Sequence, residues 1–514
     1  MSEKNATSIQ DTGKKVKDAT VGFLNKDFGM FKGLHIVCAA VVLLVLVVIC
    51  MIIASGGKKE VAYSAVYVNG DGDLMLLPAN AKADKAVKLV SENGKSSGVT
   101  YAHTTDRYVL FTKEGSLYLY DAKSKDKTKK IKSDVDDYYF TENDKYVLFT
   151  VDDDGSALYS YDFSSKDPVK LDSDISSIKD YSDNYVVYTK DDSLYIRELK
   201  GKKDKEKIYG ETTSSVSMSE DGKKVVYKDN EGNLHVYTIG NKKDNKIANE
   251  VSSFTTNKNA TKFYYTVKDG SSTDLYYYNG KKADKVASEI SSVMDYNIDA
   301  QQVLYTKKDG SKSILYYQKG TKEAAKVADD LEGVSAGFGS DKEIYFYYSD
   351  GSKQTLKYAK LSGAKVGKIT QLTDDYKSLS RIDGGIIFTS DVNSSYVGTL
   401  NIAKNGKAKK IDDDVYTSSI NISNNGKKFY YLKNYNTSKY VGDLYVSSGS
   451  AGKKLDTDVY RNFTYVKDNL IYYLKDYSSK GKGDLYRYTG KATKVAEDVS
   501  SLKSTPNYYN PDKK

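Results

Sequence analysis

Few side chains in this sequence could carry metal-centred or nucleophilic chemistry. The chain holds three histidines, His35, His103 and His235, and its two cysteines, Cys38 and Cys50, share one apolar segment. Structural and catalytic zinc sites use clustered Cys and His ligands, and a Ser-His-Asp triad needs a histidine beside its nucleophile. Three scattered histidines predict neither site, and we interpret His235 as an ordinary strand residue.

Acidic turns are the remaining candidates for metal ligands. Asp152-Asp153-Asp154-Gly155 and Asn69-Gly70-Asp71-Gly72-Asp73 offer oxygen ligands of the kind that Ca²⁺ prefers. Neither run has a Glu at the twelfth position of an EF-hand loop. Asp, Asn and Gly are also the usual residues of hairpin turns. We therefore interpret both runs as turns and predict no metal site and no other cofactor.

Aromatic and amide side chains gather in three segments near the C-terminal end, at 390–399, 433–443 and 475–484. Tyr rings offer a large, rigid contact area, and amide groups offer adaptable hydrogen bonds. The segments suit recognition if a rigid scaffold presents them. The alternative is drift, because surface loops tolerate insertions at little cost. The candidate binding residues are Tyr396, Tyr435, Tyr440, Tyr477, Asn393, Asn436 and Lys439.

An internal repeat supplies such a scaffold. A β-rich run, a Gly/Asp turn, a Leu-Tyr-x-Tyr phrase and a Lys-rich run recur along the chain, and one leucine marks each copy. Successive marker leucines lie 36 to 44 residues apart, close to the period of a four-stranded unit. The markers are Leu74, Leu117, Leu158, Leu194, Leu234, Leu275, Leu315, Leu356, Leu400, Leu444 and Leu485.

One copy shows how a unit is built. Its alternating and aromatic residues predict strands at 251–254, 262–267, 275–278 and 285–287. Asp269-Gly270 and Asn279-Gly280 predict the hairpin turns between them. From the strand-two aromatic residue to the marker leucine the distance is 6 residues in early copies. It is 12, 13 and 12 residues in the last three, so these copies carry the long loops on one rim.

The repeated phrase is clearest in Ser219-Glu220-Asp221-Gly222-Lys223-Lys224-Val225-Val226-Tyr227 and in Gly232-Asn233-Leu234-His235-Val236-Tyr237, with a degenerate copy at 423–431. These residues resemble the TolB-like, WD-type β-propeller repeat, and the resemblance covers roughly residues 60 to 503. It implies an all-β fold of about eleven four-stranded β-propeller units. Propellers usually have 4–8 blades, so we expect two packed propellers, with one large ring as the alternative. Such propellers serve many roles, so the resemblance implies no single activity.

The two ends of the repeat array are complementary. The first unit begins at its second strand, 63–68, and Val499-Ser500-Ser501 repeats the first-strand phrase with no unit after it. We predict that the C-terminal strand completes the first blade, because pairing the ends removes an exposed sheet edge.

An apolar run precedes the array. Residues 36–54 carry no charge and would span about 28 Å as a helix, close to the thickness of a bilayer core. Five lysines lie shortly before this run and two shortly after it, which places the N-terminus in the cytoplasm. We expect a cytoplasmic tail at 1–33, a transmembrane helix at 34–54, the array at 60–503 outside the cell and a C-terminal tail at 504–514.

The charge pattern excludes one class of partner. The net charge is +9, but 78 basic and 69 acidic side chains alternate, without the basic block of a nucleic-acid-binding protein. We expect a single-pass plasma-membrane protein whose external propeller is a non-catalytic binding or scaffold module for a protein or cell-envelope glycan. The alternative is a carbohydrate-active lyase or glycosidase that uses carboxylate and Tyr side chains; no distinguished carboxylate pair identifies it.

Overall fold

The computed structural model describes residues 65–78, 85–91, 99–101, 108–121, 128–141, 143–152, 155–165, 167–211, 213, 215–270, 272–467, 470–478 and 480–503. These residues belong to one compact unit, Ala62–Lys514. The expected tail at 1–33, the membrane helix at 34–54 and the C-terminal tail at 504–514 lie outside the described residues. Within the described part of the chain, no helix has the length and apolarity needed to cross a membrane.

The repeat unit folds as its sequence predicts. The copy at 251–287 forms four strands, β20 (Val251–Thr256), β21 (Phe263–Asp269), β22 (Ser272–Tyr278) and β23 (Ala283–Ala287). They pair antiparallel in chain order. Gly270 and Gly280 have φ of 59° and 95°, so the two predicted turns use glycine for its left-handed backbone. The predicted four-stranded unit is confirmed.

The other copies form the same sheet, and we name the strands of each blade A to D from the centre of the ring outward. Blade 1 contains β1 (Ala65–Asn69), β2 (Leu74–Leu77) and β3 (Val87–Val90). Blades 2 and 3 are β4 (Val99–Tyr101), β5 (Tyr108–Lys113), β6 (Ser116–Asp121) and β7 (Thr128–Lys132), then β8 (Val135–Phe140), β9 (Tyr146–Asp152), β10 (Ser156–Asp162) and β11 (Val169–Asp172). Blades 4 and 5 are β12 (Ser177–Tyr181), β13 (Tyr185–Lys190), β14 (Ser193–Glu198) and β15 (Glu206–Tyr209), then β16 (Ser215–Met218), β17 (Lys224–Lys228), β18 (Leu234–Thr238) and β19 (Lys243–Ala248).

Blade 6 is β20 to β23, and in the later blades one long strand often serves two sheets. Blades 7 and 8 are β24 (Ser292–Asn297), β25 (Gln302–Asp309), β26 (Lys312–Lys319), β27 (Ala325–Ser340), β28 (Glu343–Asp350), β29 (Lys353–Ser362) and β30 (Lys365–Thr373). Blades 9 and 10 are β31 (Tyr376–Ile382), β32 (Gly385–Ser390), β33 (Val397–Lys404), β34 (Lys407–Ile422), β35 (Phe429–Asn436), β36 (Val441–Ser447) and β37 (Lys453–Tyr460). Blade 11 is β38 (Thr464–Lys467), β39 (Leu470–Lys475), β40 (Gly483–Tyr488) and β41 (Ala492–Leu502).

The long strands join neighbouring blades by backbone hydrogen bonds. The first part of β27 pairs with β26 up to Leu331, and the part from Glu332 pairs with β28. β34 is divided in the same way between β33 and β35. Strand D of one blade thus continues as strand A of the next, which fixes the angle between these blades more firmly than packing alone.

The core consists of the layers between blades. In each blade the marker leucine on strand C is at most 1% exposed. An aromatic residue on strand B, one position before the leucine's pairing partner, is at most 4% exposed in every blade. These aromatic residues are Tyr67, Phe111, Phe149, Tyr188, Tyr227, Tyr265, Tyr305, Phe346, Phe388, Tyr431 and Tyr473.

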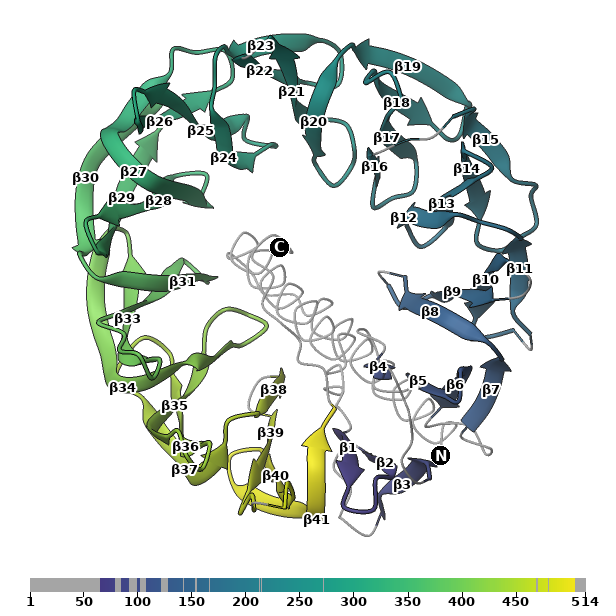
Figure 1. Ribbon diagram of the computed structural model, residues 1–514, viewed down its shortest axis with the longest axis vertical. Coiled ribbons are helices and arrows are strands. Elements are labelled where there is room, and N and C mark those ends of the chain that lie inside the picture. The colour runs from purple at the N-terminus through teal and green to yellow at the C-terminus, as the bar shows by residue number, and fades with distance from the viewer. Residues whose placement is uncertain are drawn as a thin grey trace, which may run out of the picture. The chain divides into compact units, whose positions relative to one another are not determined.

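The described residues form a single ring of eleven blades. Their buried apolar side chains group into eleven clusters, and each cluster is built from two neighbouring blades. Figure 1 shows the blades arranged around one centre, with β12, β16, β20, β24 and β31 innermost. The fold is therefore a β-propeller, and the expectation of two packed propellers is wrong. Blade number depends on the wedge angle between sheets, which no local motif encodes.

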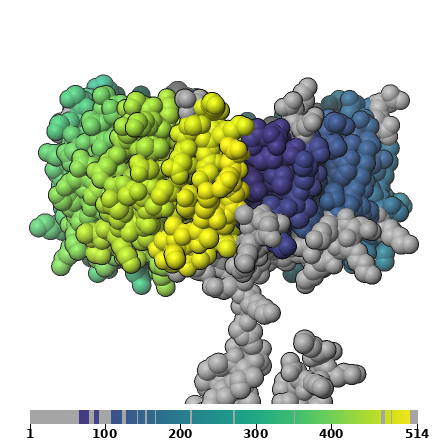
Figure 2. Space-filling model, turned by 90° about the horizontal axis from the view of Figure 1, so that it is seen from below, coloured from purple at the N-terminus to yellow at the C-terminus, as the bar shows by residue number. Residues whose placement is uncertain are grey.

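The predicted closure of the ring is confirmed. β41 pairs antiparallel with β1 through Tyr67↔Leu502, Val68↔Ser501 and Asn69↔Val499. The backbone N–H of Lys503 also donates to the Val66 carbonyl at 2.8 Å. Figure 2 shows the last described strands, in yellow, directly beside the first, in purple. One strand, β41, thus supplies strand D of blade 11 and strand A of blade 1.

Deleting residues 495–514 should therefore destabilise the whole ring. The deletion removes Val495 and Val499, both buried between blades 11 and 1, and opens one interface of a closed array. We expect the free energy of unfolding to fall by more than about 3 kcal/mol, at least the cost of emptying one large aliphatic site. Denaturant unfolding measures this change. The control ends the chain after Lys503 and keeps β41; equal stability of both truncations would show that β41 does not close the ring.

Many tyrosine hydroxyls are enclosed with their rings. Burial raises the pKa of Tyr296 to about 12, and burial with a neighbouring tyrosine raises the pKa of Tyr265, Tyr305 and Tyr376 to about 12. Burial followed by a hydrogen-bonded carboxylate raises the pKa of Tyr431 and Tyr473 further. In the folded ring these hydroxyls therefore keep their protons at pH values where a free tyrosine loses its own.

The ring should consequently unfold in alkali. A group whose pKa is higher in the folded state contributes stability below its unfolded pKa, about 10 for tyrosine, and loses that stability as the pH rises further. We expect tyrosinate absorbance and loss of β-sheet circular dichroism to rise together in one transition above about pH 10. A smooth titration of the buried tyrosines before any loss of sheet signal would contradict this expectation.

Candidate functional site

The three long loops lie where the sequence places them, between strands B and C of blades 9, 10 and 11. They connect β32 to β33, β35 to β36 and β39 to β40. The corresponding connection in blade 4 is the two-residue turn Asp191-Asp192, with φ of 46° and 55°. The predicted difference in loop length is confirmed: the connection between strands B and C is longer in blades 9, 10 and 11 than in blade 4.

The three loops share one backbone design. Each has a left-handed residue at or near the end of strand B, with φ between 51° and 55°. Asp391 and Asp476 directly follow β32 and β39, and Asn434 lies two residues before the end of β35. Asp and Asn tolerate this conformation better than other non-glycine residues do. These matching left-handed residues explain why the three segments differ in sequence and still bend in the same way.

Asn393 and Asn436 occupy equivalent places in the first two loops. The Asn393 side-chain oxygen accepts the N–H groups of Ser395 at 2.9 Å and Val397 at 3.1 Å. The Asn436 side-chain oxygen accepts the N–H groups of Ser438 and Lys439, both at 3.0 Å. Such side-chain-to-backbone bonds define Asx turns. Both side chains are exposed, and their amide oxygens accept hydrogen bonds from the backbone of their own loop.

Tyr396 and Tyr440 end their loops in a conformation that tyrosine rarely adopts. Each lies four residues before the marker leucine, with φ of 61° and 58°, and the third loop has Gly481 there, with φ of 73°. The left-handed region costs a residue with a side chain about 1–2 kcal/mol. The two rings nevertheless are 58% and 45% exposed. Unusual backbone and exposed ring together indicate that these tyrosines are not there for packing.

Two glycines hold the loop ends against strand B. A Cβ on Gly398 would lie 2.7 Å from the Ser390 carbonyl oxygen, and one on Gly442 would lie 2.9 Å from the Lys433 carbonyl oxygen. Both positions therefore require glycine. The resulting Tyr-Val-Gly-x-Leu phrase at 396–400 and 440–444 is a signal in the sequence for this loop.

Tyr435 and Tyr477 differ from the expectation that they are exposed loop-tip contacts. Both are half-buried. Tyr435 stacks on Tyr416 with ring centroids 3.8 Å apart, and Tyr477 stacks on Tyr460 at 3.9 Å. The Tyr477 hydroxyl also donates to the Ser500 carbonyl at 3.1 Å. Their rings pack inward, Tyr435 against β34 and Tyr477 against the end of β37.

Arg461 joins these tyrosines, and the sequence analysis did not identify it. Its N–H donates to the Tyr440 carbonyl at 2.9 Å, and its guanidinium lies 4.6 Å from the centre of the Tyr440 ring. Burial and the neighbouring Tyr416 raise the pKa of Tyr435 to about 12, and Arg461 opposes part of that rise. We name Tyr396, Lys439, Tyr440 and Arg461, with the stacked pairs beneath them, the rim patch.

Two half-buried clusters join the blades beneath the rim patch. Asp412 on β34 accepts hydrogen bonds from the Tyr431 hydroxyl and from Lys433. Asp456 on β37 accepts a bond from the Tyr473 hydroxyl at 2.6 Å and one from Lys475 at 2.7 Å. Each cluster joins strand D of one blade to strand B of the next. Satisfied polar networks rigidify the structure around them.

The remaining candidates have structural roles in the described residues. Asn69 caps its turn by accepting the Asp71 and Asp73 N–H groups, and Asp73 is paired with Lys88 at 2.6 Å. His235 lies in β18, stacked on Tyr227, and contacts Asp229 and Asp244 through its two ring nitrogens. A G-x-S-x-G spelling at 94–98 was missed by the sequence reasoning and, like His35 and His103, lies outside the described residues.

Comparisons with known proteins give fold-level likeness and nothing finer. No family model matches the chain, and no curated protein matches it. Among solved structures, the β-propeller domain of the Trilobed protease from Pyrococcus furiosus is 14% identical, with a TM-score of 0.29; the match covers 56% of this chain and 98% of that one. Tricorn protease is 12% identical, covering 87% of this chain and 54% of that one, with a TM-score of 0.28.

Kluyveromyces lactis Hsv2 is similar at the same level. It is 14% identical, covering 52% of this chain and 96% of that one, with a TM-score of 0.28. At such scores these structures carry no argument about activity. The assignment of an eleven-blade ring rests on the strand pairings and blade interfaces of this chain.

Replacing Tyr396 with Gly tests whether its exposed ring serves folding. Glycine relieves the left-handed backbone, and it increases the entropy of the unfolded chain by a similar amount. We therefore expect the free energy of unfolding to stay within about 1 kcal/mol of the wild-type value in thermal or denaturant unfolding. Tyr435→Ala is the contrasting variant, because it removes a stacked ring. Destabilisation by Tyr396→Gly as large as that by Tyr435→Ala would assign Tyr396 to packing.

Proposed function

We propose that this ring is a non-catalytic binding scaffold and that its ligand, a protein or a cell-envelope glycan, contacts the rim patch. The observation that carries the proposal is the equivalent, exposed and left-handed placement of Tyr396 and Tyr440 in adjacent blades. Interface anchors are enriched in tyrosine and arginine. The patch offers both, and Asp-Tyr-Lys clusters stiffen the blades below it.

Rigidity supports binding at this rim. The loops are held by Asx turns, by stacking and by Arg461, so little conformational freedom remains to be lost when a partner docks. Loops with Tyr, Ser, Asn and Gly on a rigid sheet scaffold have the composition of antibody paratopes.

The proposal includes a membrane tether. It is supported by the uncharged run at 36–54 and by the excess of lysines before it, both outside the described residues. A tether there places the ring on the external face of a plasma membrane, in a protein of the TolB-like, WD-type propeller group. A rim that recognises an envelope component suits this location.

Binding of the compact unit Ala62–Lys514 to an envelope preparation from the source cells tests the proposal. We expect the double variant Tyr396→Ala, Tyr440→Ala to weaken binding by more than about 2 kcal/mol, the loss typical of a hot spot. Sedimentation of envelope fragments with labelled protein measures the bound fraction. Treating the fragments with protease, or with glycan-degrading enzymes, separates a protein ligand from a glycan.

The control replaces Tyr139, which is 38% exposed and lies in blade 3, away from the rim patch. It should bind as the wild type does. Equal binding by the rim variant and the wild type would contradict the proposal. Release of free sugar ends from the envelope by the wild-type ring would instead favour the carbohydrate-active enzyme.

A further inference from the structure

A hollow lies between blades 8 and 9, away from the loops of the rim patch. It has a volume of about 260 Å³, more than the roughly 150 Å³ of an apolar cavity known to take up benzene. Ser335, Ala336 and Gly337 on β27 form one wall, and Leu379 and Arg381 on β31 form another. β27 and β31 supply strand A of the two blades, so the hollow lies toward the centre of the ring.

Small residues on strand A create the hollow. Gly337 pairs with Tyr345 in blade 8 as Asp295 pairs with Leu304 in blade 7. By the same pairing, blade 7 carries Val293 and Asp295 where blade 8 carries the smaller Ala336 and Gly337, and β24 has Met294 as an extra residue at a register shift. The missing side-chain volume is not replaced by the next blade, and the space remains between Leu356, Leu379 and Ile386.

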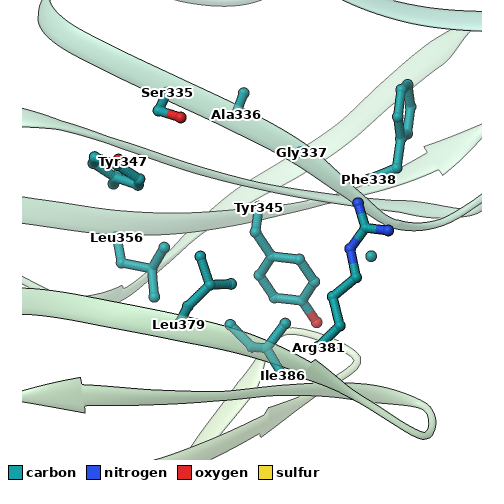
Figure 3. Close-up of a pocket in the computed structure, with 11 residues that line it drawn as sticks. Ser335, Ala336, Gly337, Phe338, Tyr345, Tyr347, Leu356, Leu379, Arg381 and Ile386 are labelled. Atoms are coloured by element: carbon teal, nitrogen blue, oxygen red, sulfur yellow. The ribbon is translucent and has the colours of Figure 1, made fainter. Parts of the chain in front are cut away.

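One buried polar atom faces this apolar lining. The Tyr345 side chain is 4% exposed, and its hydroxyl makes no hydrogen bond of ordinary geometry among the described residues; burial and the neighbouring Glu343 carboxylate raise its pKa. Figure 3 shows the aromatic side chain of Tyr345 in the middle of the residues that line the hollow, with its hydroxyl directed toward Ile386 and Arg381. A buried hydroxyl without a partner costs about 1–3 kcal/mol. A ligand atom that accepts or donates one hydrogen bond would remove that cost.

The charges around the hollow are already matched within the protein. Arg381 pairs with Asp295 at 3.1 Å, and the same carboxylate oxygen accepts the Phe338 N–H at 2.7 Å. This bond runs over Gly337, where a Cβ would lie 3.3 Å from that oxygen. Glu343 is buried, and burial raises its pKa. A charged ligand would therefore add an unbalanced charge to a partly desolvated site, which is unfavourable.

We propose that the hollow between blades 8 and 9 binds a small, uncharged aromatic molecule that carries one hydrogen-bonding oxygen. The ring of the ligand packs on Leu356, Leu379 and Ile386, and its oxygen meets the Tyr345 hydroxyl. The site is independent of the rim patch, so either proposal stands if the other fails.

Binding of p-cresol and toluene to the full-length chain in detergent tests this site. The two probes share a ring and a methyl group, and only p-cresol has the oxygen. Saturation-transfer NMR and titration calorimetry measure their binding. We expect Leu379→Trp, which fills the hollow, to abolish the site-specific signal of both probes. Detergent uptake is common to all variants and provides the baseline.

Tyr345→Phe tests the polar end of the site. We expect it to reduce p-cresol affinity about fivefold, the value of one hydrogen bond, and to leave toluene affinity unchanged or higher. Tyr264→Phe is the matched control, because Tyr264 occupies the equivalent position in blade 6 and its buried hydroxyl also has no partner among the described residues. It should leave both affinities unchanged.

Three results would overturn the proposal. The first is that neither probe binds the wild-type chain above the detergent baseline. The second is that p-cresol binding persists in a folded Leu379→Trp variant. The third is that Tyr345→Phe and Tyr264→Phe have the same effect on p-cresol. If Leu379→Trp does not fold, the comparison of the two Tyr→Phe variants decides.

Discussion

Everything in this ring depends on the burial of two side chains per blade, the marker leucine on strand C and the aromatic residue on strand B. A four-stranded sheet with both of its faces apolar is not stable in water by itself, since each face must be covered. A neighbouring blade covers one apolar face of the sheet, and the far face of that blade in turn needs another neighbour. Every sheet has both faces covered when the last sheet packs on the first. Closure through β41 therefore covers the two sheet faces that an open array would leave exposed.

The same interfaces explain how the rim can hold unusual backbone. A left-handed tyrosine costs free energy, and such a position persists where the surrounding structure over-determines it. Beneath Tyr396 and Tyr440, shared strands join blades 9, 10 and 11, and the Asp412 and Asp456 clusters tie strand D of one blade to strand B of the next. Tyr435 and Tyr477 contribute from inside by stacking. The exposed rings thus stand on blades that shared strands and polar clusters join to their neighbours.

Local patterns gave the units, the turns and the loops correctly. The marker leucine and the glycines at 270 and 280 have short-range causes, namely alternation and left-handed turns, so the sequence reveals them. The closing strand was predictable because the Val-Ser-Ser phrase at 499–501 matches the first-strand phrase of other copies. The number of rings was not predictable, because the wedge angle between neighbouring sheets results from the packing of all the blades together.

The candidate site was predictable in outline and not in detail. Loop length and composition located the rim, but the inward stacking of Tyr435 and Tyr477 depends on Tyr416 and Tyr460, which the chain supplies some 17 to 19 residues earlier. Arg461 was missed for the same reason, since nothing near it in the sequence marks its contact with Tyr440. The hollow between blades 8 and 9 arises from absent side-chain volume, which becomes visible only when blades are compared in register.

Electron microscopy of the isolated protein tests the central claim most directly. Class averages viewed along the ring axis should show one closed ring with eleven blades around a single centre. The ring should have no gap between the blade that holds β40 and the blade that holds β2. Averages that show two smaller rings, or an open ring at that junction, would contradict the account.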